Sequence, residues 1–294
     1  MSNPVFSSSP IFGERRRGAA GTAPQAGPYG TPYGPAYGTA GTAGTVAADA
    51  GALEQMYSAP AATTRDTGRL TYDDVIVKTG GLLLLLVVVA AASWTFAPRM
   101  PGLWLLGALV GLVLGLVNAF RREPSPALIV AYTVAQGVFL GGVSLAFQSM
   151  TIDGATGTAE PIVLQAILGT FATFGAALVL FRSGRVRVTP KFTRWLLVAL
   201  VGYLAFSLLN FVLSFFLASE GFGPLRNGPI GVLVGLVAVG LAAASLIVDF
   251  DAIQRGVRQG VPARYAWTAA FGLVVTLVWL YLEILRLLAI FNRN

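Results

Sequence analysis

The sequence predicts an all-α membrane protein, a seven-transmembrane-helix bundle with a disordered N-terminal tail. Three observations carry this prediction. Of the 294 residues, 55% are hydrophobic and only 11% are charged, against roughly 25% charged residues in a typical soluble domain. Seven apolar runs recur along the chain, each close to the roughly 20 residues that a helix needs to cross a bilayer. The segment before these runs has a different composition.

Residues 1–70 are rich in Gly, Ala, Pro, Thr and Tyr, and residues 28–38 form the near-repeat PYGTPYGPAYG. Such a segment has too little branched apolar surface to offset the entropy that ordering costs. It also lacks the apolar core of a signal peptide, so we expect it to stay on the chain. The sequence therefore predicts a disordered cytoplasmic tail over 1–70 and a transmembrane domain over 71–294.

The apolar runs are separated by connections that contain proline, glycine and charged residues, which end helices and favour turns. Runs of this length and number are not typical of the core of a soluble protein. The predicted spans are 80–97, 102–120, 126–148, 160–181, 194–218, 229–250 and 265–291.

The orientation follows from the distribution of Lys and Arg in the short connections, because cytoplasmic loops carry an excess of these residues. With the N-terminus inside, the inner segments hold thirteen basic residues and the outer segments hold three. The chain is therefore expected in the cell membrane, here a bacterial inner membrane, as a multi-pass protein with a cytoplasmic N-terminus and an external C-terminus.

The composition also excludes several kinds of chemistry. The chain has no cysteine and no histidine, which removes disulfides, zinc sites with those ligands and catalytic triads that contain histidine. No phosphate-binding loop or nucleophile elbow is present. The net charge of +7 is spread between apolar runs instead of forming one basic face, which argues against nucleic acid. We expect no enzyme activity and no cofactor.

Three acidic residues lie within or at the end of apolar runs, where a charge is costly and usually faces a protein interior or an aqueous path. They are Asp249, Asp251 and Glu283. A local explanation exists for each: Glu283 can pair with Arg286 three residues later, and the aspartates can form a solvated helix end near Arg255. Asp249 and Asp251 are about 200° apart around a helix, so at most one can face Glu283.

Other polar and small residues in the runs favour helix packing. Gln136 and Asn210 are expected to form hydrogen bonds between helices and not to bind ligands. Gly107, Gly111 and Gly115 recur every four residues, a spacing typical of a close helix contact. We also expect Tyr132, Ser144 and Ser214 to form hydrogen bonds between helices and not to bind ligands.

Three stretches together resemble the Bax inhibitor-1/YccA-like family, also called transmembrane Bax inhibitor motif proteins. They are Tyr132-x-x-x-Gln136-Gly137-x-x-x-Gly141, Asp249-Phe250-Asp251-Ala252-Ile253-Gln254 and Leu280-Tyr281-Leu282-Glu283. The resemblance covers about residues 72–291. It implies a seven-helix fold with the last helix in the centre. The family usually has Glu at the position of Gln136 and Asp at the position of Glu283.

In bacterial members, the resemblance implies a pH-sensitive calcium leak governed by two facing carboxylates on the sixth and seventh helices. Here these would be Asp249 or Asp251 together with Glu283, which would also bind calcium transiently, with Arg286 as a lock. Two close carboxylates in a poorly solvated site cannot both ionise cheaply, so such a pair can bind a proton without histidine. Deprotonated, it offers the oxygen ligands that calcium prefers.

A second hypothesis is a non-conducting regulator that binds another membrane protein, such as a quality-control protease. The long N-terminal tail fits this hypothesis well. A secondary transporter with inverted repeats is a weaker alternative, because seven helices do not divide evenly and no pair of interrupted helices is visible. The sequence alone does not separate a channel for calcium or protons from a regulator.

Overall fold

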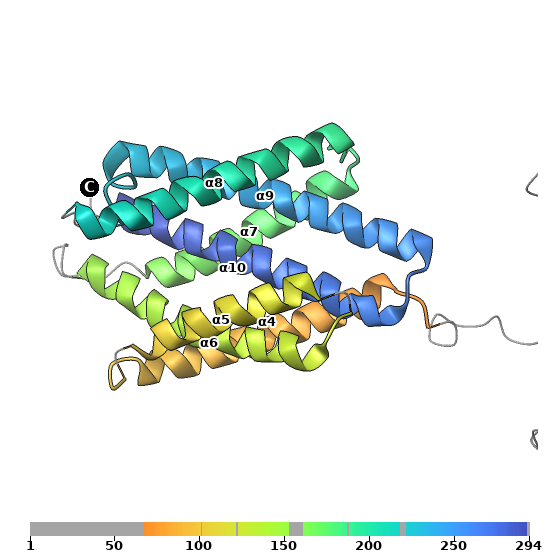
Figure 1. Cartoon of the computed structure of the whole chain (residues 1–294), viewed down its shortest axis with the longest axis horizontal. Helices are drawn as coiled ribbons and strands as arrows, with labels where there is room; N and C mark the ends of the chain where they lie inside the picture. The colour runs from red at the N-terminus through yellow and green to blue at the C-terminus, as the bar shows by residue number, and fades with distance from the viewer. Residues whose placement is uncertain are drawn as a thin grey trace, which may run out of the picture. The chain divides into compact units, whose positions relative to one another are not determined.

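The computed structural model describes residues 68–100, 102–121, 123–152, 161–186, 188–217 and 222–292. Within these ranges it contains seven long apolar helices, which confirms the predicted fold class. The predicted tail up to residue 67, the acidic connection 153–160 and the last two residues lie outside the described ranges. The helices, which form one bundle (Figure 1), are α4 (Tyr72–Phe96), α5 (Leu103–Phe120), α6 (Pro126–Ile152), α7 (Ile162–Arg182), α8 (Pro190–Phe216), α9 (Gly228–Gln259) and α10 (Ala266–Phe291), with a 3-10 turn, η1 (Ala263–Tyr265), before α10.

Two helices extend well beyond the predicted apolar runs. α4 begins at Tyr72 because Thr71 and Asp74 form a capping box, in which the Thr71 hydroxyl accepts from the Asp74 amide at 3.1 Å. α9 continues to Gln259 and ends at Gly260, which has a φ of +64°, a conformation that glycine adopts at little cost. Apolar runs mark the part of a helix that lies in hydrocarbon, so spans predicted from hydropathy alone leave out the polar ends of these two helices. For α9, the sequence also allows a continuation to about Arg258, because Gly260 and Pro262 are the first residues that would stop the helix.

The segment before α4 belongs to the folded unit. The amide of Leu70 donates to the Val261 carbonyl at 2.7 Å, and the amide of Ala263 donates to the Gly68 carbonyl at 2.8 Å. The Leu70 side chain is only 5% exposed. Residues 68–70, which the sequence assigned to the tail, therefore fix the start of α4 to the connection between α9 and α10.

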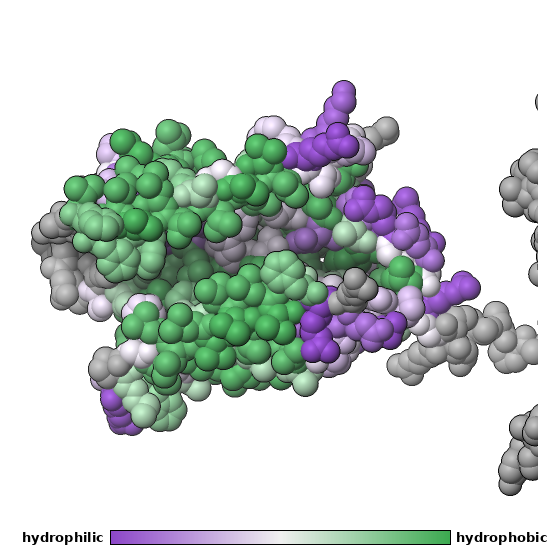
Figure 2. Space-filling view, viewed as in Figure 1, coloured by the Kyte–Doolittle hydropathy of each residue, from purple (hydrophilic) through white to green (hydrophobic). Residues whose placement is uncertain are grey.

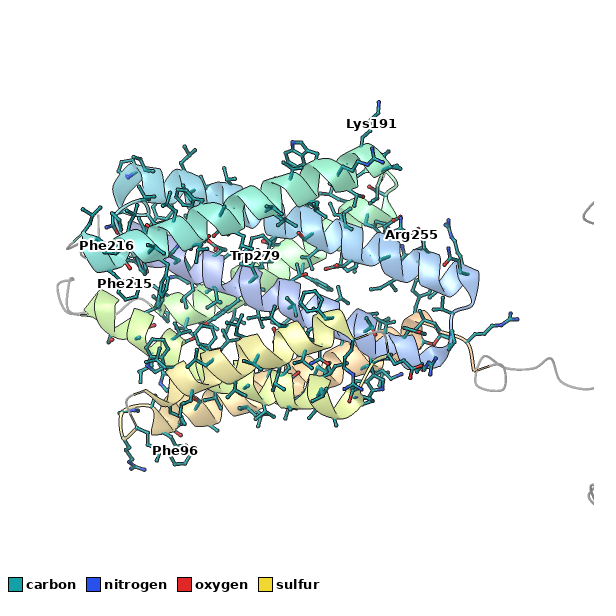
Figure 3. The ribbon with its side chains drawn as sticks, in the orientation of Figure 1. Phe96, Lys191, Phe215, Phe216, Arg255 and Trp279 are labelled. Atoms are coloured by element: carbon teal, nitrogen blue, oxygen red, sulfur yellow. The ribbon has the colours of Figure 1, made fainter. Side chains whose placement is uncertain are left out.

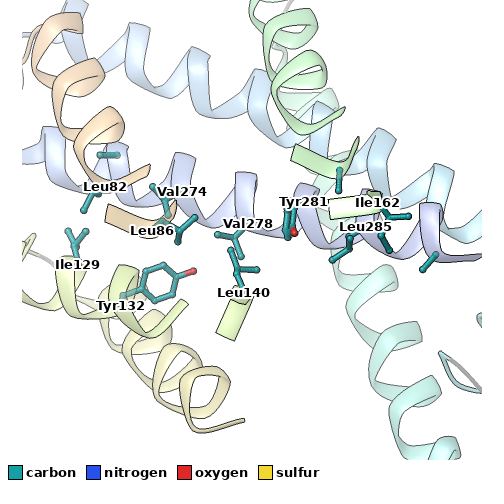
Figure 4. Packing of buried hydrophobic residues seen from close by; sticks show 13 residues of the cluster. Leu82, Leu86, Ile129, Tyr132, Leu140, Ile162, Val274, Val278, Tyr281 and Leu285 are labelled. Atoms are coloured by element: carbon teal, nitrogen blue, oxygen red, sulfur yellow. The ribbon is translucent and has the colours of Figure 1, made fainter. Parts of the chain in front are cut away.

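The last helix lies in the centre of the bundle, as the family resemblance implied. α10 packs against α4, α6, α7 and α9, and 72% of its most apolar stretch is buried, against 11% for α5 and α8. The side chains that gather along it are seen in Figure 4 and include Leu82, Leu86, Ile129, Leu140, Ile162, Val274, Val278, Tyr281 and Leu285.

α5 and α6 approach each other closely along the predicted glycine stripe. A Cβ atom at Gly107 would lie 2.8 Å from the Phe139 nitrogen and 2.9 Å from the Ala135 carbonyl oxygen. Gly111 and Gly115 face the side chains of Gln136 and Tyr132 on the same helix. The sequence prediction of a tight helix contact is confirmed.

The surface of the bundle has a polar end and a long apolar flank. Figure 2 shows hydrophilic residues gathered at the end where α4 begins and α9 ends, while apolar residues cover the sides of the helices. Figure 3 shows Lys191 and Arg255 at the polar end and Phe96, Phe215 and Phe216 at the opposite end. This distribution is that of a multi-pass membrane protein.

Candidate functional site

A buried ion pair lies in the second half of α10. Glu283 and Arg286 are 4% and 8% exposed and form an ion pair through Arg286 Nη2. Arg286 Nη1 also donates to Glu283 Oε1 at 3.2 Å. The local i, i+3 pairing considered from the sequence is confirmed. A lone charge at this position would be costly in hydrocarbon, so each side chain offsets the burial of the other.

Two aromatic side chains complete the surroundings of the Glu283 carboxylate. The Tyr203 hydroxyl of α8 donates to Oε1, and the Trp279 indole nitrogen donates to the same oxygen at 3.3 Å. Figure 3 shows Trp279 between α8 and α10. A carboxylate with this many donors is held in one orientation, because each hydrogen bond to a charged group strengthens the arrangement.

A second arginine joins the cluster from the connection between α8 and α9. Arg226 Nη2 donates to the Tyr203 hydroxyl at 2.8 Å and to Ser207 Oγ at 2.6 Å. Its guanidinium also lies 5.1 Å from the centre of the Tyr203 ring. Arg286 Nη2 reaches the same hydroxyl at 3.5 Å. The described part of this cluster thus contains two guanidinium groups and one carboxylate, with Tyr203 joining all three.

The sequence did not single out Tyr203 or Arg226. Tyr203 and Ser207 stand one helical turn apart in an otherwise apolar run, which is the spacing of residues on one helix face. Arg226 was counted only as a basic residue of a connection. The pair of polar residues four positions apart was the available signal for this site. The spacing did not indicate which residues of other elements the pair would contact.

Asp249 is half-buried and contacts a different part of α10. The Thr276 hydroxyl donates to Asp249 Oδ2 at 2.8 Å. Thr276 precedes Glu283 by seven residues, which is two turns and about 10 Å along the axis. The direct approach of the two carboxylates expected from the sequence is not among the contacts of the described residues. Asp249 of α9 instead contacts α10 at Thr276, about two turns before Glu283.

Asp251 points to another side of α9, where Arg255 Nη1 lies 2.6 Å from its carboxylate. The Arg255 side chain is 56% exposed, so this is the solvated helix-end pair considered from the sequence. Across the described ranges, no three acidic, His or Cys side chains are grouped closely enough to hold a metal ion. A common site of Asp249, Asp251 and Glu283 is therefore not among the groups of the described residues, and a site formed by two of these carboxylates stays a prediction.

The two polar residues assigned to helix packing have different roles. Gln136 lies against Gly111 of α5, and its Oε1 is buried without a hydrogen-bond partner in the described part of the chain. Asn210 accepts from the Leu225 amide at 2.9 Å and donates to the Phe222 carbonyl at 3.0 Å. Asn210 therefore holds the connection that carries Arg226, and the expected bond between helices is not among its contacts.

Ser144 fulfils the expectation of an interhelical hydrogen bond, since its hydroxyl lies 2.7 Å from the Tyr281 hydroxyl of α10.

A family model described as Bax inhibitor 1 like matches residues 3–293. The chain belongs to the Bax inhibitor 1-like family. A comparison with curated proteins found no match. This Bax inhibitor 1-like protein is therefore a multi-pass membrane protein whose central helix carries the buried ion pair.

Proposed function

We propose that this protein is a pH-sensitive cation leak of the membrane, with calcium as the main candidate ion and protons as the second. The observation that carries the proposal is the position of Glu283 and Arg286, buried together in the central helix, while Asp249 of α9 contacts the same helix two turns away, at Thr276. Ionisable residues inside transmembrane segments usually mark an ion path or a proton relay.

In this mechanism the leak is closed as long as Glu283 and Arg286 form their ion pair. Glu283 offsets the charge of Arg286, and the Tyr203 hydroxyl holds Arg226 beside them. When Glu283 binds a proton, two guanidinium groups in a poorly solvated site lose the carboxylate that separates their charges. Like charges repel strongly in such a site. The repulsion between Arg226 and Arg286 then drives the Arg286 side chain away from the route that the cation takes past Glu283.

Asp249 is the cation station in this proposal. Its carboxylate and the neighbouring Thr276 hydroxyl supply oxygen atoms, which are the ligands that calcium prefers. Because Asp249 contacts α10 at Thr276, about 10 Å before Glu283 along the helix axis, an ion would pass the two carboxylates in sequence. The carboxylates thus act one after the other, and they need not touch.

Calcium flux into liposomes that contain the purified protein tests the proposal. Wild-type flux should be low at neutral pH and rise on acidification. Glu283→Gln cannot form the ion pair, so its flux should be high and nearly independent of pH. Asp249→Asn should reduce flux severalfold at every pH, because it removes the charge of the cation station.

Asp251→Asn is the matched control, since it removes an aspartate from the same helix whose partner is the exposed Arg255, and its flux should equal that of the wild type. A parallel measurement with a pH-sensitive dye identifies proton flux. A folded protein that conducts neither ion at any pH would overturn the proposal and favour a non-conducting regulator that binds another membrane protein.

A further inference from the structure

A cavity of about 590 Å³ lies between α4, α6, α7 and α10. Its volume falls within the roughly 300–1,000 Å³ that is usual for ligand sites. The back wall includes Leu86, Leu140, Val278 and Tyr281, which are all buried and are labelled in Figure 4. None of these residues belongs to the ion-pair cluster, so the cavity is a separate feature of the bundle.

The cavity is continuous with the lipid-facing surface. α4 and α7 both pack against α10 but have little contact with each other. At the rim, Val87 of α4 is 52% exposed, and Leu164 and Phe171 of α7 are 55% and 54% exposed. The opening thus lies between two helices whose outer sides face the hydrocarbon of the bilayer.

The chemistry of the wall suits hydrocarbon. None of the residues that line the cavity is charged. The hydroxyls of Ser144 and Tyr281 satisfy each other at 2.7 Å, and the Thr170 hydroxyl donates to the Ala166 carbonyl of its own helix at 2.7 Å. These three hydroxyls are already paired, and Gln148, which also lines the cavity, is not without a partner. Cavities with largely apolar walls tend to exclude water and accept apolar molecules.

The length of the cavity matches one leaflet of a bilayer. Along α4 the lining extends from Leu83 to Trp94, which are eleven positions apart in the sequence and so about 16 Å apart at the rise of a helix. The hydrocarbon core is about 30 Å thick, so one leaflet contributes about 15 Å. Trp94 lies close to the end of α4 at Phe96, where tryptophan favours the membrane interface.

From its lining, length and opening, we infer that this cavity binds one acyl chain of a phospholipid from the leaflet in which α4 ends. The chain enters between α4 and α7 with its headgroup at the level of Trp94. Its methylene groups then fill the space along Leu86, Val278 and Tyr281. The lipid becomes part of the packing around α10, beside the helix that carries the ion pair.

Trp94 provides the readout, because bromine on an acyl chain quenches a tryptophan that it contacts. A variant that keeps Trp94 and has phenylalanine at the other four tryptophans is purified in detergent and titrated with phosphatidylethanolamine that carries a brominated acyl chain. We expect saturable quenching at about one lipid per protein, well before the added lipid becomes a large fraction of the micelle. Quenching that rises in proportion to the lipid fraction without saturation would overturn the proposal.

Two pairs of variants place the lipid in the cavity. Ala91→Phe narrows the cavity from α4, while Ala92→Phe adds the same ring to an exposed neighbour that is not among the lining residues. Ile167→Phe and Leu168→Phe are the equivalent pair on α7. Ala91→Phe and Ile167→Phe should lose the saturable quenching, whereas both controls should keep it.

Thermal unfolding in detergent identifies which variants fold. If Ala91→Phe does not fold, the pair on α7, Ile167→Phe and Leu168→Phe, decides the outcome. Equal saturable quenching in a folded cavity variant and its control would contradict the proposal. Saturable quenching by a brominated free fatty acid but not by the brominated phospholipid would also contradict it, since the ligand would then be the fatty acid. A stable dimer that blocks the quenching would assign the opening to a second copy of the chain.

Discussion

At the scale of single residues, one phenolic hydroxyl connects the charged groups around the ion pair, Glu283, Arg286 and Arg226. Tyr203 donates to Glu283 and accepts from Arg226, so its one oxygen acts as donor and acceptor at the same time. The arrangement reaches across α8, α10 and the connection before α9. Charged hydrogen-bond networks in poorly solvated sites are costly when one member is removed, because the others are left without partners.

The substitution Tyr203→Phe should therefore destabilise the protein by about 1–3 kcal/mol, the usual cost of leaving buried polar groups unsatisfied. The measurement is unfolding in detergent, followed by tryptophan fluorescence. Tyr72→Phe is the control, because Tyr72 is 47% exposed at the start of α4, and it should unfold like the wild type. Equal stability of the two variants would contradict the role given to Tyr203.

At the scale of helices, close contacts depend on positions that have no side chain. α5 is among the least buried of the seven helices, and it is held to α6 through the glycine stripe. Without a strong hydrophobic drive between helices in lipid, van der Waals contact between closely packed backbones stabilises such pairs. The close approach of the α5 and α6 backbones thus depends on these three glycine positions.

Replacement of Gly107 by alanine tests this contact, because the new methyl group would meet the α6 backbone at 2.8–2.9 Å. Alanine favours a helix over glycine by about 1 kcal/mol, yet Gly107→Ala should destabilise the protein by about 1–3 kcal/mol through overpacking. Gly202→Ala on α8 is the control, because a Cβ atom there has no neighbour within 4 Å. The control should be as stable as the wild type or more so, and the thermal unfolding midpoint measures both.

At the scale of the whole molecule, seven crossings put the two ends of the described bundle on opposite sides of the membrane. The end at which α4 begins also carries Lys191 and Arg255 (Figure 3). An excess of basic residues favours the cytoplasmic side, so we predict that this end is cytoplasmic. α10 ends at the opposite side, and the phospholipid cavity opens in the leaflet of that side.

Reporter fusions measure this orientation. A reporter that is active only in the cytoplasm should be active at Ser58 and inactive when fused after Asn294. A reporter that is active only outside should give the reverse pattern. If both fusions report the same side, the number of crossings in the membrane differs from seven. If the pattern is reversed, the charge argument is wrong although the fold is unchanged.

The sequence by itself determined the local features of this protein. The length of the apolar runs predicted seven spans, and the glycine spacing predicted a close helix contact of α5. The separation of three residues offered the pair of Glu283 with Arg286 as one of two interpretations. Each depends on residues close together in the chain, where helix geometry alone fixes which side chains are neighbours.

The tertiary structure alone decided which partners Asp249 and Glu283 take and where the cavity lies. It also decided which helix is central, which the family resemblance had implied but hydropathy left open. α5 and α10 are equally apolar, yet 11% of one and 72% of the other is buried. In a bilayer, lipid-facing and protein-facing positions are both apolar, so hydropathy does not distinguish them. Thr276 contacts Asp249, and Tyr203 contacts Glu283, because the packing of α8, α9 and α10 sets the depth of each side chain in the bundle.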